Sequence, residues 1–171
     1  MAIEAAYLGI TLRLDDADEP NRAFFRHCRD GTLHLQACAA CRRVHYPPSP
    51  ACPFCGGIEQ SWTAVGASGS VYSFTEVHHA TNAAYKPYVP YMVAIVELDA
   101  QRGEPAPTDA IRIPAPVVLP DGSFAPPAVL SGIGVNSRMR MVFRTVSEDI
   151  ALPAWTPDET SPPEAGIWRP A

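Results

Sequence analysis

The chain of 171 residues is long enough for one modest domain or two small ones, and its apolar content of 47% is ordinary for a protein with a packed core. Its 13 basic and 18 acidic side chains give a net charge of −5, which disfavours a nucleic-acid-binding protein because such a protein needs a basic face. No apolar run reaches the roughly 20 residues of a membrane span, and Met1–Glu4 lacks the features of a secretory signal, so we expect a cytoplasmic protein with no membrane partner.

The first predicted element is a short helix, which follows an N-terminal stretch without clear periodicity. Asp18 or Glu19 can cap this helix, and Pro20 suits its first turn. Gly31 can end it, because glycine readily adopts the left-handed conformation that often follows a helix C-terminus. We therefore expect residues 1–31 to form an N-terminal segment with one helix.

One face of this helix is predicted to be apolar, because Phe24, Phe25 and Cys28 lie at helical spacing. Core packing is the favoured role of the two phenylalanines, and contact with a ligand or a partner protein is the alternative. Cys28 has no partner cysteine in the sequence. We expect it to be a small buried apolar residue rather than a reactive thiol.

Two Cys-x-x-Cys pairs, ten residues apart, are the strongest motif, and a predicted strand at 32–36 leads into them. Each pair can form a tight turn, or knuckle, with both thiolates on one side, and two facing knuckles complete a tetrahedral site. The predicted metal ligands are Cys38, Cys41, Cys52 and Cys55. Because the protein fills all four positions, we expect a structural Zn²⁺, with iron as the alternative ion. Disulfides are disfavoured because no secretory signal is recognised.

The segment between the two knuckles carries basic side chains. Arg42 and Arg43 could hold a phosphate group, such as that of CoA, through bidentate hydrogen bonds, and a solvated tip is the alternative. His45 is expected at the surface, because four cysteines already complete the metal site.

The second half of the chain is predicted to form a small β-barrel. Alternating or apolar runs indicate strands at 62–65, 69–77, 91–98, 111–119, 128–131 and 138–146. Short strands with glycine turns and no helical crossover favour a closed antiparallel barrel such as an OB-fold. The expected fold class is therefore mainly β, with a rubredoxin-like zinc ribbon at 32–60 and an OB-fold at 61–150. Residues 151–171 are rich in proline and aperiodic, which predicts an extended arm that orders only against a partner.

Finer signals lie within these strands. Gly66 and Gly69 predict a bend or bulge where a barrel turns a corner. The nearly continuous apolar run at 91–98 predicts a strand buried on both faces. Pro114 and Pro116 place the strand that contains them at a sheet edge, because proline has no N–H to donate.

Histidines and tyrosines of the second half are the remaining candidate site residues. His78 and His79 are adjacent at a strand end, so they point to opposite faces and cannot act as one pair. A polar loop position is favoured for both over a role as a base, and His78 is also a candidate contact to a ligand or partner. Tyr85 and Tyr88 lie in an aromatic loop that either caps the barrel mouth or contacts a partner or a CoA ligand.

The order of these motifs resembles the DUF35 family, whose members are zinc-ribbon plus OB-fold proteins associated with acyl-CoA chemistry. The resemblance rests on the helix, the paired knuckles and four further stretches: Gly31–Cys38, Trp62, Gly69–Thr75 and Pro90–Asp99. It covers residues 20–146. A departure lies at 100–127, where a longer Pro-rich stretch replaces the short glycine-containing turn expected for the family.

The resemblance implies a non-catalytic accessory subunit of a hetero-oligomer. Members of the family bind thiolase-like enzymes, including the aldolase of steroid side-chain degradation, archaeal hydroxymethylglutaryl-CoA synthase assemblies and related acyltransferases. In these complexes the partner carries the catalytic residues, and the zinc-ribbon/OB subunit stabilises it and helps to build the CoA channel. The implied chemistry is the formation or cleavage of C–C bonds in acyl-CoA thioesters, in lipid or steroid metabolism.

Two other functional classes compete with this reading. Zinc ribbons and OB-folds also occur in modules that bind single-stranded nucleic acids, although the acidic charge balance opposes this function. A free-standing enzyme would have to use His78, His79 or Cys28, because the sequence contains no Ser-His-Asp order and no Gly-rich phosphate loop.

Overall fold

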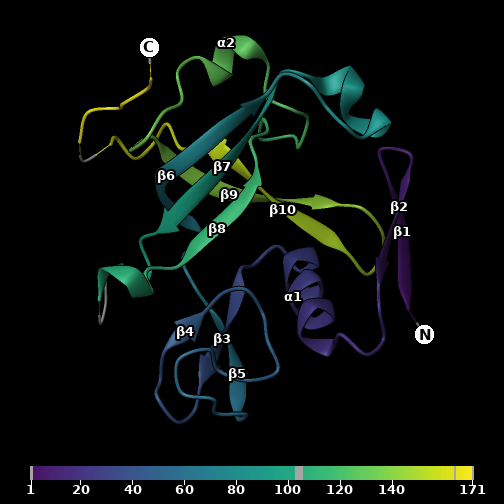
Figure 1. The fold of residues 1–171 in the computed structure, drawn as a ribbon, viewed down its shortest axis with the longest axis vertical. Helices are drawn as coiled ribbons and strands as arrows, with labels where there is room; N and C mark the ends of the chain where they lie inside the picture. Colours follow the sequence, from purple (N-terminus) through teal and green to yellow (C-terminus); the bar gives the residue numbers. More distant parts are fainter. Residues whose placement is uncertain (1, 103–105, 164, 171) are drawn as a thin grey trace. The chain divides into compact units, whose positions relative to one another are not determined.

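In the computed structural model, which describes residues 2–102, 106–163 and 165–170, the chain divides into two units. The first unit comprises Met1–Gly66, Ala100–Ile111 and Phe143–Leu152. The second comprises Ala67–Asp99, Arg112–Val142 and Pro153–Ala171. Strands dominate both units, which confirms the mainly β fold class (Figure 1). Across the described ranges, we find no helix with the length and apolar character that a membrane crossing requires.

The first unit begins with a hairpin that was not expected. Strand β1 (Ile3–Tyr7) pairs antiparallel with β2 (Ile10–Leu14). The linking residues Leu8 and Gly9 both have positive φ, 51° and 79°, as a two-residue turn of type I′ requires. Leucine is unusual at the first of these positions, so the turn carries no sequence signal.

The predicted N-terminal helix is confirmed as α1 (Glu19–Arg29). The carboxylate of Asp18 accepts hydrogen bonds from the backbone N–H of Asn21, at 3.4 Å, and from its side-chain amide, at 2.8 Å. This Asp18 cap satisfies an N–H group that has no partner inside the helix. Gly31, with φ of 76°, follows the last turn as expected.

A three-stranded antiparallel sheet of order β4-β3-β5 forms the ribbon of the first unit. Its central strand is β3 (His34–Cys38), flanked by the short β4 (Val44–His45) and by β5 (Gln60–Ala64). Strand β5 occupies most of the strand predicted at 62–65, but it pairs with β3. The structure therefore places it in the ribbon sheet and not in the barrel, to which the sequence had assigned it.

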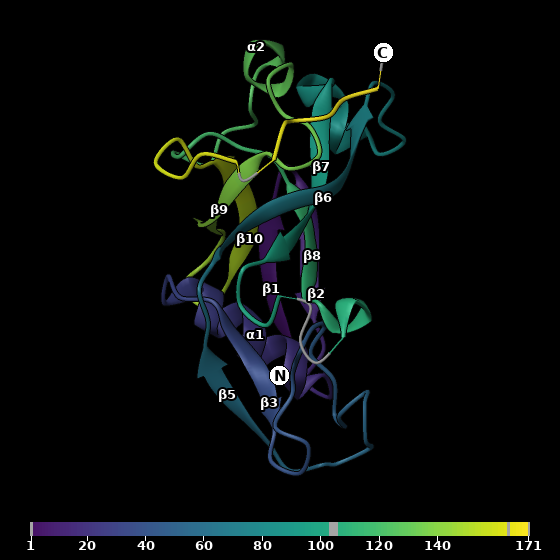
Figure 2. The same ribbon diagram turned by 90° about the vertical axis from the view of Figure 1, so that its left-hand side faces the viewer.

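The second unit is built on a five-stranded antiparallel sheet of order β10-β9-β6-β7-β8 (Figure 2). Two of its strands, β9 and β10, extend into segments of the first unit. The bounds are Ser68–Val77 for β6, Tyr91–Leu98 for β7, Arg112–Pro116 for β8, Arg138–Thr145 for β9 and Ala151–Pro157 for β10.

The sequence predicted a closed barrel, but the sheet does not close through a continuous ladder of hydrogen bonds. Its edge strands are β8 and β10, and a single isolated parallel bridge between Val117 and Trp155 connects them. Beside this bridge, the N–H of Val118 donates to the carbonyl of Trp155 at 2.8 Å. Pro114 and Pro116 have no N–H, so β8 cannot donate a regular ladder toward β10.

Strand β7 lies next to the middle of the sheet, and its burial alternates. Met92, Ala94, Val96 and Leu98 are fully buried, whereas the side chains between them are half-buried. The expectation of a strand buried on both faces therefore holds for only one face. A bulge does occur in β6, but the register to β7 shifts between Val71 and Ser73, after the Gly66–Gly69 stretch where the sequence predicted it.

A short helix replaces one predicted strand. Residues 128–131 were expected to be extended, but Pro127–Leu130 form the helix α2. Pro127 occupies the first helical turn, where its missing N–H costs nothing, and Leu130 is buried. Figures 1 and 2 both place α2 at the same end of the second unit as residues 165–170.

The expectation of an aperiodic arm is wrong for residues 151–157, because they form the edge strand β10. Trp155 is 0% exposed, and its indole N–H donates to the carbonyl of Ile113 at 3.0 Å. Consecutive buried residues, Ala154 to Thr156, hide the alternation by which a strand is recognised in sequence.

Candidate metal centre

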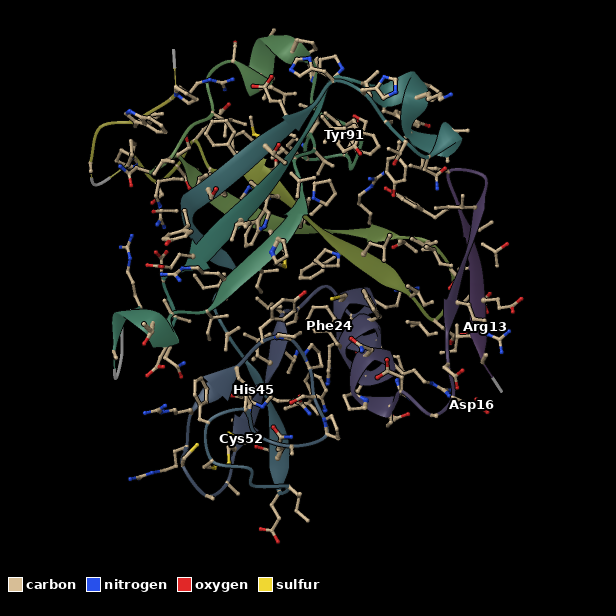
Figure 3. All side chains as sticks on the ribbon, in the orientation of Figure 1. Arg13, Asp16, Phe24, His45, Cys52 and Tyr91 are labelled. Carbon is tan, nitrogen blue, oxygen red and sulfur yellow. The ribbon has the colours of Figure 1, made fainter. Side chains whose placement is uncertain are left out.

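The four predicted cysteine ligands come together at the end of the ribbon. Their Sγ atoms all lie within 4.8 Å of one another, and Figure 3 shows the sulfur atoms near the labelled Cys52. The Cys38–Cys55 and Cys41–Cys52 sulfur pairs are each 3.6 Å apart. Zn–S bonds of about 2.3 Å at tetrahedral angles put sulfurs about 3.8 Å apart, so this spacing fits a four-thiolate zinc site.

The two knuckles repeat one backbone conformation. The N–H of Arg42 donates to the carbonyl of Cys38 at 2.9 Å, and the N–H of Gly56 donates to that of Cys52 at the same distance. Both donors have positive φ, 61° at Arg42 and 75° at Gly56. A glycine adopts this conformation without strain, whereas an arginine pays a steric cost for it.

Gly57 lies against the sulfur atoms. A Cβ atom at this position would lie 3.1 Å from the Sγ of Cys38, 3.4 Å from that of Cys55 and 3.5 Å from the Cβ of Ala40. Any side chain would therefore push the ligands of a bound ion. The absence of a side chain at Gly57 is part of the fit of the site to a metal.

Backbone N–H groups prepare one ligand for its ionised form. The N–H of Cys41, assisted by that of Ala40, hydrogen-bonds to the sulfur of Cys38 and lowers its pKa to about 7. At Cys55 the N–H of Gly57 acts in the same direction, but hydrogen bonds with the neighbouring thiols outweigh it and raise the pKa to about 11. A bound divalent cation displaces the protons that the neighbouring thiols share in these hydrogen bonds, because its ligands are thiolates.

The donor set, the sulfur spacing and the backbone N–H groups that bond to the sulfurs thus fit a structural Zn²⁺ held by Cys38, Cys41, Cys52 and Cys55. All four positions are protein sulfurs, so the ion would have no position for a substrate. Its contribution is to fold the ribbon, because so small a sheet has little core of its own.

A buried polar network supports the ribbon, and the sequence did not predict it. His45 is 3% exposed, so the expected surface position is wrong. Its Nε2 pairs with the side-chain oxygen of Gln60, and its Nδ1 lies 3.3 Å from the carbonyl of Pro47. The N–H of Ser49 donates to Gln36 at 2.7 Å, while Gln60 donates to the carbonyl of Ser49 at 2.9 Å. Figure 3 shows His45 within the ribbon.

Arg42 and Arg43 do not form a free pair of cations. Arg42 is exposed. Arg43 forms an ion pair with Asp109 at 3.5 Å, and its guanidinium lies 4.7 Å from the centre of the Phe54 ring. Arg42 is therefore the more accessible of the two for an anion, and Arg43 would have to exchange an existing partner.

The Pro-rich insertion that departs from the family pattern packs on the edge of the ribbon. The side chain of Gln101 accepts a hydrogen bond from the N–H of Val44 and donates one to its carbonyl, both at 2.9 Å. The same amide donates to the carbonyl of Asp109 at 3.3 Å. The insertion thus satisfies backbone groups at the open edge of β4.

The apolar stripe of α1 is core. Phe24 is 2% exposed, and its ring centre lies 5.3 Å from that of Phe25 and 5.7 Å from that of Tyr46. Figure 3 shows Phe24 on α1. Cys28 is 1% exposed, and burial raises its pKa to about 12, as expected of a structural cysteine. Phe25 is half-buried and keeps some accessible surface.

Tyr85 and Tyr88 belong to an aromatic cluster on the second unit. They lie on a 3-10 helix at Ala83–Tyr88. The ring of Phe124 completes the cluster, 4.8 Å from Tyr88 and 5.6 Å from Tyr91, which is labelled in Figure 3. Phe124 was missed because it lies in a distant loop. Tyr88 is 38% exposed, so the cluster presents an aromatic surface.

The histidines after β6 are not arranged for catalysis. His78 and His79 are exposed, and the Nε2 of His78 lies 3.4 Å from a carboxylate oxygen of Glu76. Glu76 is also paired with Arg169. These contacts are typical of a surface ion-pair group rather than of a poised base.

Comparison with protein families gives two matches. A model described as "ChsH2, rubredoxin-like zinc ribbon domain" matches residues 25–59. A model described as "ChsH2, C-terminal OB-fold domain" matches residues 62–144. The predicted sequence of a zinc ribbon followed by an OB-fold is therefore confirmed.

Comparison with individual proteins gives two informative similarities. The solved structure titled "Ltp2-ChsH2(DUF35) aldolase" contains a chain that matches with a TM-score of 0.63 and 26% identity, covering 84% of this chain and 98% of that one. The "Probable enoyl-CoA hydratase alpha subunit" of Thermomonospora curvata is 37% identical over 78 residues. That alignment covers 46% of this chain, which spans only 24% of the relative's length.

Proposed function

Because the chain belongs to the DUF35 family, with its zinc ribbon and OB-fold in the family order, we propose that it is a non-catalytic accessory subunit of an acyl-CoA enzyme. We further propose that this enzyme is a thiolase-superfamily member, either a thiolase, an aldolase or an acyltransferase. The subunit would bind it in a hetero-oligomer and help to form the channel for CoA.

The similarity to the Ltp2-ChsH2(DUF35) aldolase carries this proposal. Its matching chain is covered almost completely, and its title names a complex with a second component and an aldolase activity. The similarity to a protein named as an enoyl-CoA hydratase subunit points to the same class of thioester substrate. Both relatives are named as parts of larger assemblies.

The chemistry of the described residues supports a non-catalytic role. Four of the five thiols are the grouped ligands of the metal centre. Cys28, the fifth cysteine of the chain, is buried with a pKa of about 12, so it is protonated at neutral pH and cannot act as a nucleophile. Such a chain supplies structure to an active site that another subunit carries.

Two surfaces are the proposed contacts. The aromatic cluster around Tyr85 and Tyr88 offers apolar area with hydroxyl groups, the composition of many protein interfaces. At the tip of the ribbon, Arg42 is proposed to bind a phosphate of CoA, with Arg43 in support. Phe25 and His78 are accessible secondary candidates, whereas the burial of Phe24 limits it to packing.

Co-expression with a thiolase-like enzyme of the same genome tests the proposal. We expect the two chains to elute together in size-exclusion chromatography and the enzyme to gain stability or activity. Tyr88→Ala should weaken the complex, whereas Tyr72→Ala, at another exposed tyrosine, should not. Separate elution with unchanged enzyme activity would refute the accessory role.

One observation favours a second function. Aromatic rings exposed on an OB-fold, here Tyr88 beside Phe124, are also the platform on which single-stranded nucleic acids stack. The net charge of −5 opposes this function. A gel-shift assay that shows micromolar binding of a single strand at physiological salt would support it over the accessory role.

A further inference from the structure

A cavity in the second unit has no role in the proposed function. It has a volume of about 260 Å³ and is lined by residues of β9, β10 and α2 together with the loop that follows β8. These elements lie in the upper part of Figure 1. Its volume is just below the range of about 300–1,000 Å³ found for pockets of drug-sized ligands, which indicates a smaller occupant.

A buried hydroxyl group in the wall of this cavity has no partner. Thr156 of β10 is 1% exposed, and its Oγ1 makes no hydrogen bond within the described part of the chain. Native proteins pair nearly all buried polar groups, because an unpaired group loses its hydration without compensation. A ligand in the cavity would supply the missing partner.

An uncommitted guanidinium group also lines the cavity. In the second unit, the other arginines form ion pairs: Arg112 with Glu97, Arg138 with Asp99 and Arg169 with Glu76. Arg140 of β9 has no ion pair or hydrogen bond from its side chain to any residue that the structure describes. Its planar fork of donors matches the two oxygens of a carboxylate.

Carboxylates and apolar groups complete the lining. Asp158 and Glu159 follow β10, and one oxygen of Asp158 is held by the backbone N–H of Thr160 at 3.1 Å and its hydroxyl at 2.6 Å. This leaves the other oxygen of Asp158 available to a donor. The apolar part of the wall consists of Leu119, Pro120, Val129 and Pro157.

We propose that this cavity binds a small zwitterion, an α-amino acid with a short aliphatic side chain. A simple anion would be attracted by Arg140 but repelled by the two carboxylates, and a simple cation would meet the opposite conflict. A zwitterion satisfies both signs: its carboxylate pairs with Arg140 and accepts from the Thr156 hydroxyl, while its ammonium group pairs with Asp158 or Glu159. The aliphatic side chain then covers the apolar wall.

Calorimetry with the full, zinc-loaded chain and three probes tests the ligand class. L-leucine carries all three features, 4-methylpentanoate lacks the ammonium group and 3-methylbutylamine lacks the carboxylate. We expect leucine to bind and each analogue to bind at least about 10-fold more weakly, because each leaves a charged group without its partner. No leucine binding in the millimolar range, or equal binding of an analogue, would overturn the proposal.

Substitutions in the cavity provide an independent test. Thr156→Val keeps the shape of the side chain but removes the unpartnered hydroxyl, so it should raise the melting temperature of the ligand-free protein by about 2–4 °C while weakening leucine binding. Arg140→Gln should weaken binding without that rise. Thr145→Val, at an exposed threonine of β9, is the matched control and should change neither.

Thr156→Val is expected to raise the melting temperature and to weaken leucine binding, and these two opposite effects distinguish a binding site from a packing defect. A melting temperature that does not rise would show that the hydroxyl is already satisfied, which removes the premise. Unchanged leucine affinity in both cavity variants would place the ligand elsewhere. Because no partner enzyme takes part, failure here leaves the accessory-subunit proposal untouched.

Discussion

Replacing Gly57 with alanine introduces one methyl group beside the sulfur atoms of the metal centre. The new Cβ would lie 3.1 Å from the Sγ of Cys38 and 3.4 Å from that of Cys55. Gly57 does not have a positive φ, so the substitution causes no backbone strain of its own. Its effect is therefore confined to the contact with the metal ligands.

The size of the expected loss in zinc affinity follows from how little the metal–sulfur distances can change. A carbon atom at 3.1 Å from a sulfur forces one of them to move by a few tenths of an ångström. Metal–ligand distances in a well-formed site hold to within about 0.2 Å, so the sulfur of Cys38 cannot move that far without weakening its bond. Perturbations next to the ligands cost about 10–100-fold in metal affinity, and we expect a loss of this size.

Competition with a chromophoric zinc chelator at neutral pH measures this affinity. Gly66→Ala is the control, because a Cβ atom there meets nothing within 4 Å. We expect Gly57→Ala to lose zinc at a lower chelator concentration than the wild type and Gly66→Ala to behave as the wild type does. Equal affinities in all three proteins would refute the steric argument, and equal losses in both variants would show that the methyl group acts elsewhere.

Three further predictions concern stability. Cys52→Ala should unfold the ribbon, because metal binding and folding are one process in so small a sheet; full thermal stability together with retained partner binding would contradict this. Gly69→Ala should cost about 2–4 kcal/mol in urea denaturation, because its Cβ would lie 2.1 Å from the carbonyl oxygen of Glu97; an unchanged midpoint would show that β6 and β7 can separate freely. Arg169→Met should cost about 2 kcal/mol in the same assay, because it removes hydrogen bonds to the carbonyls of Leu130 and Ile133 and the ion pair with Glu76; a loss below about 0.5 kcal/mol would mean that solvent screening cancels these contacts.

The metal centre was fully predictable from the sequence, because its requirements are local. A Cys-x-x-Cys turn brings two sulfurs together within four residues, and the spacing of the two turns leaves only a short loop to close. Helix α1 was predictable for the same reason, since Asp18, Pro20 and Gly31 act on the backbone next to them.

Tertiary structure decided the features that depend on distant partners. His45 has the sequence context of a surface loop, but it is buried because Gln60 lies beside it in the folded ribbon. Trp155 lies two residues after Pro153 in an aperiodic stretch, yet it is buried in the core, where the carbonyl of Ile113 accepts its N–H. The unpartnered hydroxyl of Thr156 and the ring of Phe124 likewise acquire their meaning only in the folded chain.

The sequence by itself determined which residues hold the ion, where the helix begins and ends, and that short strands follow in the order of a ribbon and an OB-fold. Tertiary structure alone decided which strands pair at the edges, that the five-stranded sheet meets itself at one bridge, and which polar groups are buried. The physical reason is the range of the interactions. Caps, turns and metal knuckles act over a few residues of chain, whereas burial and strand pairing are set by segments far apart in the sequence.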